Sequence, residues 1–106
     1  MITETYEGET PTLVCDTAPV MLDDLGAERI VLSLAPHGST QRIDLDGERL
    51  QVSGPLVSVQ LTQQETLALR GRVTAQLNAL LEDGRRVASA PIVFTVSSNI
   101  YDEVMQ

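Results

Sequence analysis

The sequence has few of the residues from which metal, cofactor and nucleic-acid sites are commonly built. Its 106 residues include one cysteine, one histidine, no tryptophan and no lysine. A single cysteine excludes an intrachain disulfide and a cysteine metal cluster. Seven arginines against fifteen acids give a net charge of −8, which lacks the basic footprint of a nucleic-acid-binding protein. We therefore expect no cofactor, no metal ion and no nucleic acid among its ligands.

Long apolar runs are also missing. No stretch approaches the roughly 18–20 apolar residues that span a bilayer, and acids stand where a signal peptide would begin with bases. We expect no signal peptide, no transmembrane segment and no membrane partner. A chain of 106 residues suits one domain, 1–106, with residues 97–106 as a tail.

Apolar and polar residues alternate with a period of two over much of residues 28–96, which predicts short strands. The Asp-Gly pair at 46–47 predicts a two-residue hairpin turn between 41–45 and 48–52, with Asp44 opposite Arg49 and Ile43 opposite Leu50. The residues Leu56 to Leu61 form another predicted strand, with Val57, Val59 and Leu61 pointing inward.

A second Asp-Gly pair, at 83–84, predicts a longer hairpin between 73–81 and 88–96. A two-residue loop there would place Val73 opposite Phe94, Ala75 opposite Ile92, Leu77 opposite Ala90 and Ala79 opposite Ala88. Pro91 cannot donate to a strand ladder, so it predicts an edge or a bulge in the returning strand.

Between these hairpins, Thr62 and Glu65 have the spacing of a capping box, which predicts one or two helical turns over 62–67. Such a turn would carry the chain from one sheet to the other. The whole pattern predicts an all-β fold, an immunoglobulin-like two-sheet antiparallel β-sandwich with one short helical crossover turn.

No constellation in the sequence predicts catalysis. His37 and Ser39 lie in a run of turn-forming residues that lacks the setting of an activated nucleophile. The run from Asp44 to Glu48 lacks the ligand spacing of a calcium loop and suits a hairpin turn. Cys15 has no base near it in sequence, so we interpret it as a core thiol. We predict no catalytic residue and no enzymatic activity.

The acids are concentrated at the N-terminus, where residues 1–28 hold seven acids and no base. This segment is either a solubilising surface or a docking surface for a basic patch on a partner. The candidate contact residues are Glu4, Glu7 and Glu9. At the other end, Ile100, Tyr101 and Val104 would contact a partner if residues 98–106 form a short helix, whereas a frayed tail would present no such surface.

Several segments together resemble the N-terminal immunoglobulin-like domain of baseplate upper proteins, from tailed phages and prophages of Gram-positive bacteria. They are YEGETPTL (6–13), VSVQLTQQETL (57–67), GRVTAQL (71–77), the Asp-Gly pair at 83–84 and VAS (87–89). The resemblance implies a non-enzymatic virion or prophage structural protein, located in the virion or in the host cytoplasm during assembly.

The implied partners are other phage tail or baseplate subunits, with a second copy of the chain as a further option. The alternative function is a small carbohydrate-binding or adhesion module. Such modules usually stack sugar rings on exposed aromatics, and this chain has only Tyr6, Tyr101 and Phe94, the last predicted inward.

Overall fold

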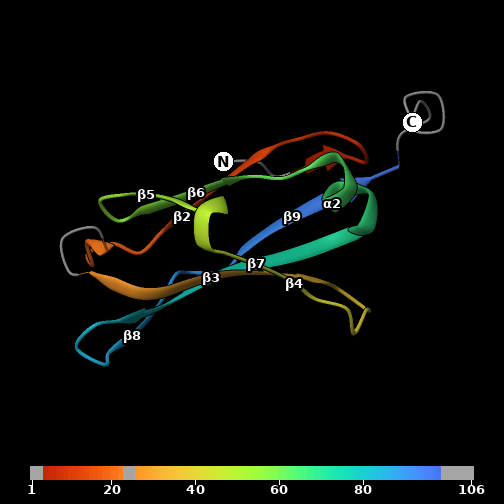
Figure 1. Cartoon of the computed structure of the whole chain (residues 1–106). Coiled ribbons are helices and arrows are strands. Elements are labelled where there is room, and N and C mark those ends of the chain that lie inside the picture. The colour runs from red at the N-terminus through yellow and green to blue at the C-terminus, as the bar shows by residue number, and fades with distance from the viewer. Residues whose placement is uncertain (1–3, 23–25, 99–106) are drawn as a thin grey trace.

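The computed structural model describes residues 4–22 and 26–98, which form two β-sheets packed face to face (Figure 1). The larger sheet contains β1 (Glu4–Tyr6), β3 (Ala27–Pro36), β4 (Ile43–Asp46), β7 (Gly71–Leu81), β8 (Arg86–Ala88) and β9 (Ile92–Ser97). The smaller sheet contains β2 (Thr12–Asp16), β5 (Gln51–Ser53) and β6 (Leu56–Gln60). Two short helices, η1 (Gly47–Arg49) and α2 (Gln63–Ala68), lie in the connections between the sheets.

The strand order is that of an immunoglobulin-like sandwich. The larger sheet runs β1-β9-β7-β3-β4, with β8 also paired to β7, and the smaller sheet runs β2-β6-β5. The smaller sheet therefore takes the places of immunoglobulin strands B, E and D, while β9, β7, β3 and β4 take those of G, F, C and C′. All pairs are antiparallel except β1 with β9. The predicted fold class is confirmed.

The core lies between the sheets and follows the predicted alternation. Along β7 every second side chain is buried, at no more than 3% exposure, in the order Val73, Ala75, Leu77, Ala79 and Leu81. The smaller sheet contributes Val57 and Val59 as predicted, and Leu61 just beyond β6 is also buried. Full burial of one such Leu or Val side chain contributes roughly 1.5–3 kcal/mol relative to exposure.

The predicted capping box forms at the start of α2. The Thr62 hydroxyl accepts a hydrogen bond from the Glu65 amide (3.2 Å), and the Glu65 carboxylate accepts one from the Thr62 amide (2.8 Å). The chain leaves the smaller sheet at the end of β6 and enters the larger sheet at β7. The short helical crossover between the sheets is therefore confirmed.

The predicted hairpin around Asp46 and Gly47 is wrong. Ile43 lies opposite Leu34 and Asp44 opposite Ser33, because β4 pairs with β3, whereas β5 pairs with β6 in the other sheet. Gly47 has a φ of +63° and opens η1, which takes the chain across the sandwich instead of back along β4. An Asp-Gly pair between alternating runs suits both connections, and the pairing with distant strands decides between them.

The second hairpin is correct at its far end and one residue out of register near its loop. Val73 lies opposite Phe94 and Ala75 opposite Ile92, as predicted, but Ala79 lies opposite Val87. The loop has three residues, since the Leu81 amide bonds to the Arg85 carbonyl (2.9 Å) and the Gly84 amide to the Leu81 carbonyl (3.0 Å). Three-residue hairpin loops commonly end in a glycine with a positive φ, and here that residue is Gly84.

The change of register is absorbed just before Pro91, where the sequence predicts an edge or a bulge. The Leu77 amide donates to the Ser89 hydroxyl (3.0 Å), and the Gln76 side-chain amide donates to the Ser89 carbonyl (3.0 Å). Ser89 is thereby buried, at 3% exposure. Its side chain compensates for the ladder bonds that a proline-containing strand cannot make.

Gly84 provides a test of this loop. Its φ of +90° is the left-handed region, and a Cβ there would meet nothing within 4 Å, so only backbone strain opposes a side chain. We expect Gly84→Ala to lower the free energy of unfolding by about 1 kcal/mol, measured by urea denaturation. Gly84→Asn is the control, because asparagine tolerates this conformation better, and equal losses in the two variants would contradict the assignment.

Candidate functional site

The three N-terminal acids predicted to contact a partner have different environments. Glu4 and Glu9 are exposed, whereas Glu7 is buried at 3% exposure and its carboxylate lies 3.2 Å from the Arg70 guanidinium. Glu9 accepts hydrogen bonds from the Tyr6 amide (2.7 Å) and the Thr5 hydroxyl (3.2 Å). Glu7 and Glu9 therefore hold the N-terminal segment in place, which leaves Glu4 as the most available of the three.

Thr66 is the residue that attaches this segment to the sandwich, and the sequence analysis did not identify it. Its side chain is fully buried, and its hydroxyl accepts a hydrogen bond from the Gly8 amide (3.0 Å). The same hydroxyl donates to the Glu9 carbonyl (2.8 Å) and to the Gln63 carbonyl (3.1 Å). A threonine directly after a capping-box pattern indicates only a helix, so the sequence carries no signal for its long-range role.

The parallel pairing of β1 with β9 places the N-terminal strand against the last strand. Glu4 lies opposite Thr95 and Tyr6 opposite Ser97, and the Ser97 hydroxyl donates to the Glu4 carboxylate (3.0 Å). Tyr6 on β1 is 46% exposed, and Val93 on β9 is 41% exposed on the same outer face of the larger sheet. We call this surface, formed by Glu4, Tyr6, Val93, Thr95 and Ser97, the β1 edge. The predicted contact residues Ile100, Tyr101 and Val104 lie outside the described residues.

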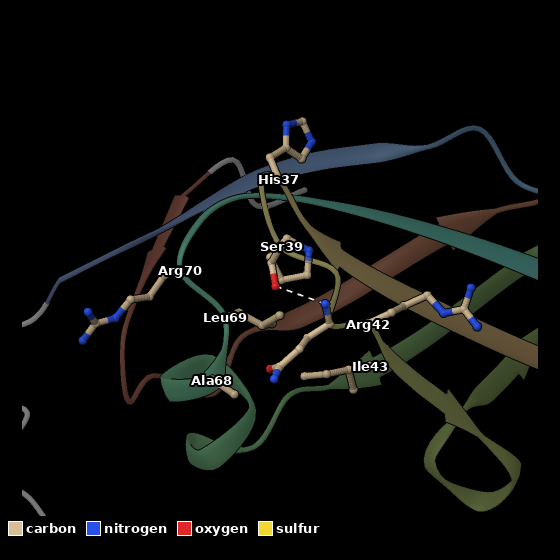
Figure 2. Close-up of a pocket in the computed structure, with 9 residues that line it drawn as sticks. His37, Ser39, Arg42, Ile43, Ala68, Leu69 and Arg70 are labelled. Carbon is tan, nitrogen blue, oxygen red and sulfur yellow. Dashed lines mark hydrogen bonds between the residues drawn. The ribbon is translucent and has the colours of Figure 1, made fainter.

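A second candidate is a cavity of about 510 Å³ between the loop after β3 and the end of α2 (Figure 2). Ile43, Ala68 and Leu69 form its apolar side, and Figure 2 shows the side chains of His37, Arg42 and Arg70 extending away from them in different directions. The cavity therefore has an apolar floor and charged groups only at its rim.

His37 and Ser39 both line this cavity, but their side chains bond to different groups. The His37 Nε2 atom lies 2.7 Å from the Thr74 hydroxyl, and the Ser39 hydroxyl accepts from the Gln41 amide (3.1 Å). The two residues therefore do not form a nucleophile and base pair in this structure. The predicted role of this run as a loop agrees with the turn at residues 37–38 and the bend at Thr40.

Asp44, part of the pattern that superficially resembled a calcium loop, is engaged within the sheet. The Ser33 hydroxyl donates to its carboxylate (2.7 Å), and Arg42 forms an ion pair with it (3.0 Å). The Ser33 hydrogen bond, helped by Arg42 and Arg29, lowers the pKa of Asp44. Within residues 4–22 and 26–98, no group of three or more His, Cys, Asp or Glu side chains is placed to hold a metal ion.

Arg49 and Glu65 connect the two crossovers. Arg49, the last residue of η1, donates from both terminal nitrogens to the Glu65 carboxylate at 3.0 and 2.8 Å and also to the Gln60 carbonyl. The Arg49 hydrogen bond is the main cause that lowers the pKa of Glu65, and the Thr62 amide adds to it. A bidentate pair of this kind fixes geometry as well as charge.

Cys15 lies in β2 with its side chain in the core, at 1% exposure. Burial raises the pKa of its thiol, and a hydrogen bond with Ser89 partly opposes that rise. A thiol in this setting is a poor nucleophile. The interpretation of Cys15 as a core thiol is confirmed.

The sequence matches no protein-family model and no curated protein. One solved structure to which the chain is similar is "Drosophila OTK, extracellular domains 3-5", with 22% identity and a TM-score of 0.37. The match covers 92% of this chain and 32% of that chain, so this chain spans about a third of its length. The strand order and register described above define the fold without this likeness. None of the helices in the described ranges is long and apolar enough to cross a membrane.

The first prediction from this site concerns Thr66. Thr66→Val keeps the shape of the side chain but leaves the Gly8 amide and the Glu9 carbonyl without their partner. We expect the free energy of unfolding to fall by about 1–3 kcal/mol, measured by urea denaturation. Thr12→Val, at an exposed position of β2, is the matched control and should change stability by less than about 0.5 kcal/mol. A loss no larger than the control's would contradict the role of Thr66.

The second prediction concerns pH. Because the folded-state pKa of Glu65 is lowered, its contribution to stability is fully present above about pH 5 and is lost as pH falls through the folded-state pKa. Arg49→Gln removes the main cause of the lowered pKa of Glu65. The free energy of unfolding of this variant should therefore fall less than that of the wild type between pH 6 and pH 3.

The control for this measurement is Arg85→Gln at the tip of the second hairpin. There the pKa of Asp83 is lowered chiefly by the backbone amide of Arg85, which the substitution retains. The substitution removes only the second cause, the Arg85 side-chain hydrogen bond, so the pH dependence of this variant should depart from the wild type less than that of Arg49→Gln. An Arg49→Gln curve parallel to the wild-type curve would show that the pair does not act as inferred.

Proposed function

We propose that the protein is a non-enzymatic structural and assembly module of a phage or prophage tail or baseplate, which acts through contacts with neighbouring subunits. The resemblance of its segments to baseplate upper proteins supports this proposal. The immunoglobulin-like sandwich also supports it, because two packed sheets present faces and edges suited to protein contacts. The fold alone does not specify a function, so the proposal depends on a surface.

The observation that carries the proposal is the β1 edge. In the part of the chain that the structure describes, β1 pairs only with β9, but Glu9 already engages the Tyr6 amide and carbonyl, so this edge would contact a partner chiefly through its side chains. Tyr6 and Val93 add exposed apolar area on the adjoining face, and tyrosine is enriched at the centres of protein interfaces. Glu4 supplies a negative charge beside them.

Of the predicted acidic docking surface, only the part on strand β1 belongs to this edge. Glu4 lies on the β1 edge, whereas Glu7 contributes from within the fold by holding Arg70. The same edge carries Ser97, whose hydroxyl donates to the Glu4 carboxylate. The other predicted contact residues, Ile100, Tyr101 and Val104, lie outside the described residues.

The carbohydrate-binding alternative has less support. Phe94 is buried at 1% exposure, and among the described residues Tyr6 is the one exposed aromatic side chain. A sugar-stacking platform with a single ring would bind weakly. Glycan-array binding that is lost in Tyr6→Ala would favour this alternative over the assembly role.

The assembly role is tested by immobilising the full chain and probing it with tail and baseplate proteins encoded beside its gene. We expect at least one to be retained at low salt and to be weakened as salt rises, because Glu4 contributes a screened charge. Tyr6→Ala should weaken that complex by about 10- to 30-fold, as truncation of a central tyrosine does.

Leu56→Ala is the matched control, since Leu56 is 41% exposed on the outer face of the smaller sheet. It should leave the affinity within about twofold. Retention of no tail or baseplate protein at low salt would overturn the proposal, and equal losses in the two variants would remove the β1 edge from it.

A further inference from the structure

The arginines of this acidic protein are gathered on one face. Four of the seven lie exposed on or beside the outer face of the larger sheet, namely Arg29, Arg42, Arg72 and Arg86. The outer face of the smaller sheet has no arginine, since the outward positions of β2, β5 and β6 are Thr12, Val14, Asp16, Gln51, Ser53, Leu56, Ser58 and Gln60. The two outer faces of the sandwich therefore differ in charge.

Three of these arginines surround an open hollow of about 460 Å³ on the larger sheet. Arg29, Arg42 and Arg86 line it, together with Val31, Ser33, Asp44, Asn78, Ala79 and Leu80. We call this surface the basic hollow. Arg42 is paired with Asp44, but none of the ion pairs in the described ranges involves Arg29 or Arg86.

The strand register gives the basic hollow a defined pattern. Arg86 lies opposite Leu80 on one side, and Arg29 lies opposite Leu80 on the other, so one row across β8, β7 and β3 reads Arg, Leu, Arg. Neighbouring strands are about 4.8 Å apart, which places the two arginine backbones roughly 10 Å from each other. Leu80 is half-buried and offers apolar contact between them.

We propose that the basic hollow binds an acidic segment of a partner protein that carries two carboxylates on either side of an aliphatic side chain. Guanidinium groups bind carboxylates bidentately, and Arg29 and Arg86 have no competing ion pair in the described ranges. The aliphatic side chain would pack on Leu80 and Val31. Asp44 keeps Arg42 engaged, so Arg42 does not act as a primary partner.

An acidic protein fits this surface better than a nucleic acid does. Asp44 lines the hollow and Asp46 lies opposite Val31 at its border, so a continuous phosphate backbone would meet two carboxylates. The chain as a whole has a net charge of −8, which opposes a polyanion at long range. A short segment with two spaced charges carries fewer negative charges than a phosphate backbone and so meets less of both repulsions. This inference deepens the proposed function by naming the chemistry of one partner contact, and it concerns a different surface from the β1 edge.

The test uses the full chain and a fluorescent peptide of sequence Ser-Glu-Ser-Leu-Ser-Glu-Ser with blocked ends, titrated at 50 mM salt. We expect saturable binding that weakens at least fivefold at 200 mM salt and is lost when both glutamates of the peptide are glutamine. Amide NMR shifts should be confined to residues of β3, β4, β7 and β8. Absence of saturable binding, or shifts elsewhere on the molecule, would overturn the proposal.

The variant that tests the arginines is Arg29→Glu combined with Arg86→Glu, which should weaken peptide binding at least tenfold. Arg72→Glu is the matched control, because Arg72 is exposed, has no ion pair in the described ranges and lies opposite Thr95 toward the other end of β7. It should leave the affinity within about twofold. An equal loss in the control, or tighter binding of a short DNA duplex than of the peptide, would refute the inference.

These outcomes separate the basic hollow from the assembly role. If the double arginine variant still retains a tail or baseplate protein with wild-type affinity, and the peptide does not bind, the basic hollow is refuted while the assembly proposal stands. If the peptide binds as expected but no tail or baseplate protein is retained, the assembly proposal fails and the acidic-segment site remains.

Discussion

The structure depends on the burial of one face of β7 between the two sheets. This strand pairs with β3, β8 and β9, so three neighbours take their register from it. Its inward side chains alternate between large and small, and each is at most 3% exposed. Because a shift by one residue would turn all of them to water, the burial of this face fixes the register of most of the larger sheet.

The connections between the sheets follow from that constraint. A chain that enters β7 must first leave the smaller sheet, and α2 makes this crossing in one capped turn of helix. The earlier crossing at η1 is held to the later one by the Arg49–Glu65 pair, while Thr66 ties the same helix to the N-terminal segment. Two segments far from α2 in the sequence thus meet at this helix, and polar contacts hold them there.

The features that the sequence predicts well are those set by nearest neighbours and by one buried face. The strand over Leu56 to Gln60, the capping box at Thr62 and the pairing of Val73 with Phe94 are of this kind. The sequence predicts less well where two local solutions have the same pattern. Asp46-Gly47 suits a hairpin and a crossover equally, and the outcome depends on β3 and β6, which are distant in sequence.

The same reason explains why the candidate site was predicted only in part. Counting acids along the chain located an excess at the N-terminus but could not show that Glu7 is buried against Arg70, 63 residues away. Nor could it show that Arg29 and Arg86, 57 positions apart, flank Leu80 in one row. The chain is acidic as a whole, whereas this face of the larger sheet presents arginines.

This difference bears on how an acidic protein can join an assembly. A uniformly negative surface would repel further copies and other acidic subunits, and only basic partners could approach it. Here Arg70 pairs with the buried Glu7 and Thr66 holds the turn after β1, while the larger sheet presents arginines without ion partners in the described ranges. The molecule can then offer a negative edge at β1 and a positive hollow beside β8 on the same sheet. Two unlike surfaces allow contacts with two unlike neighbours.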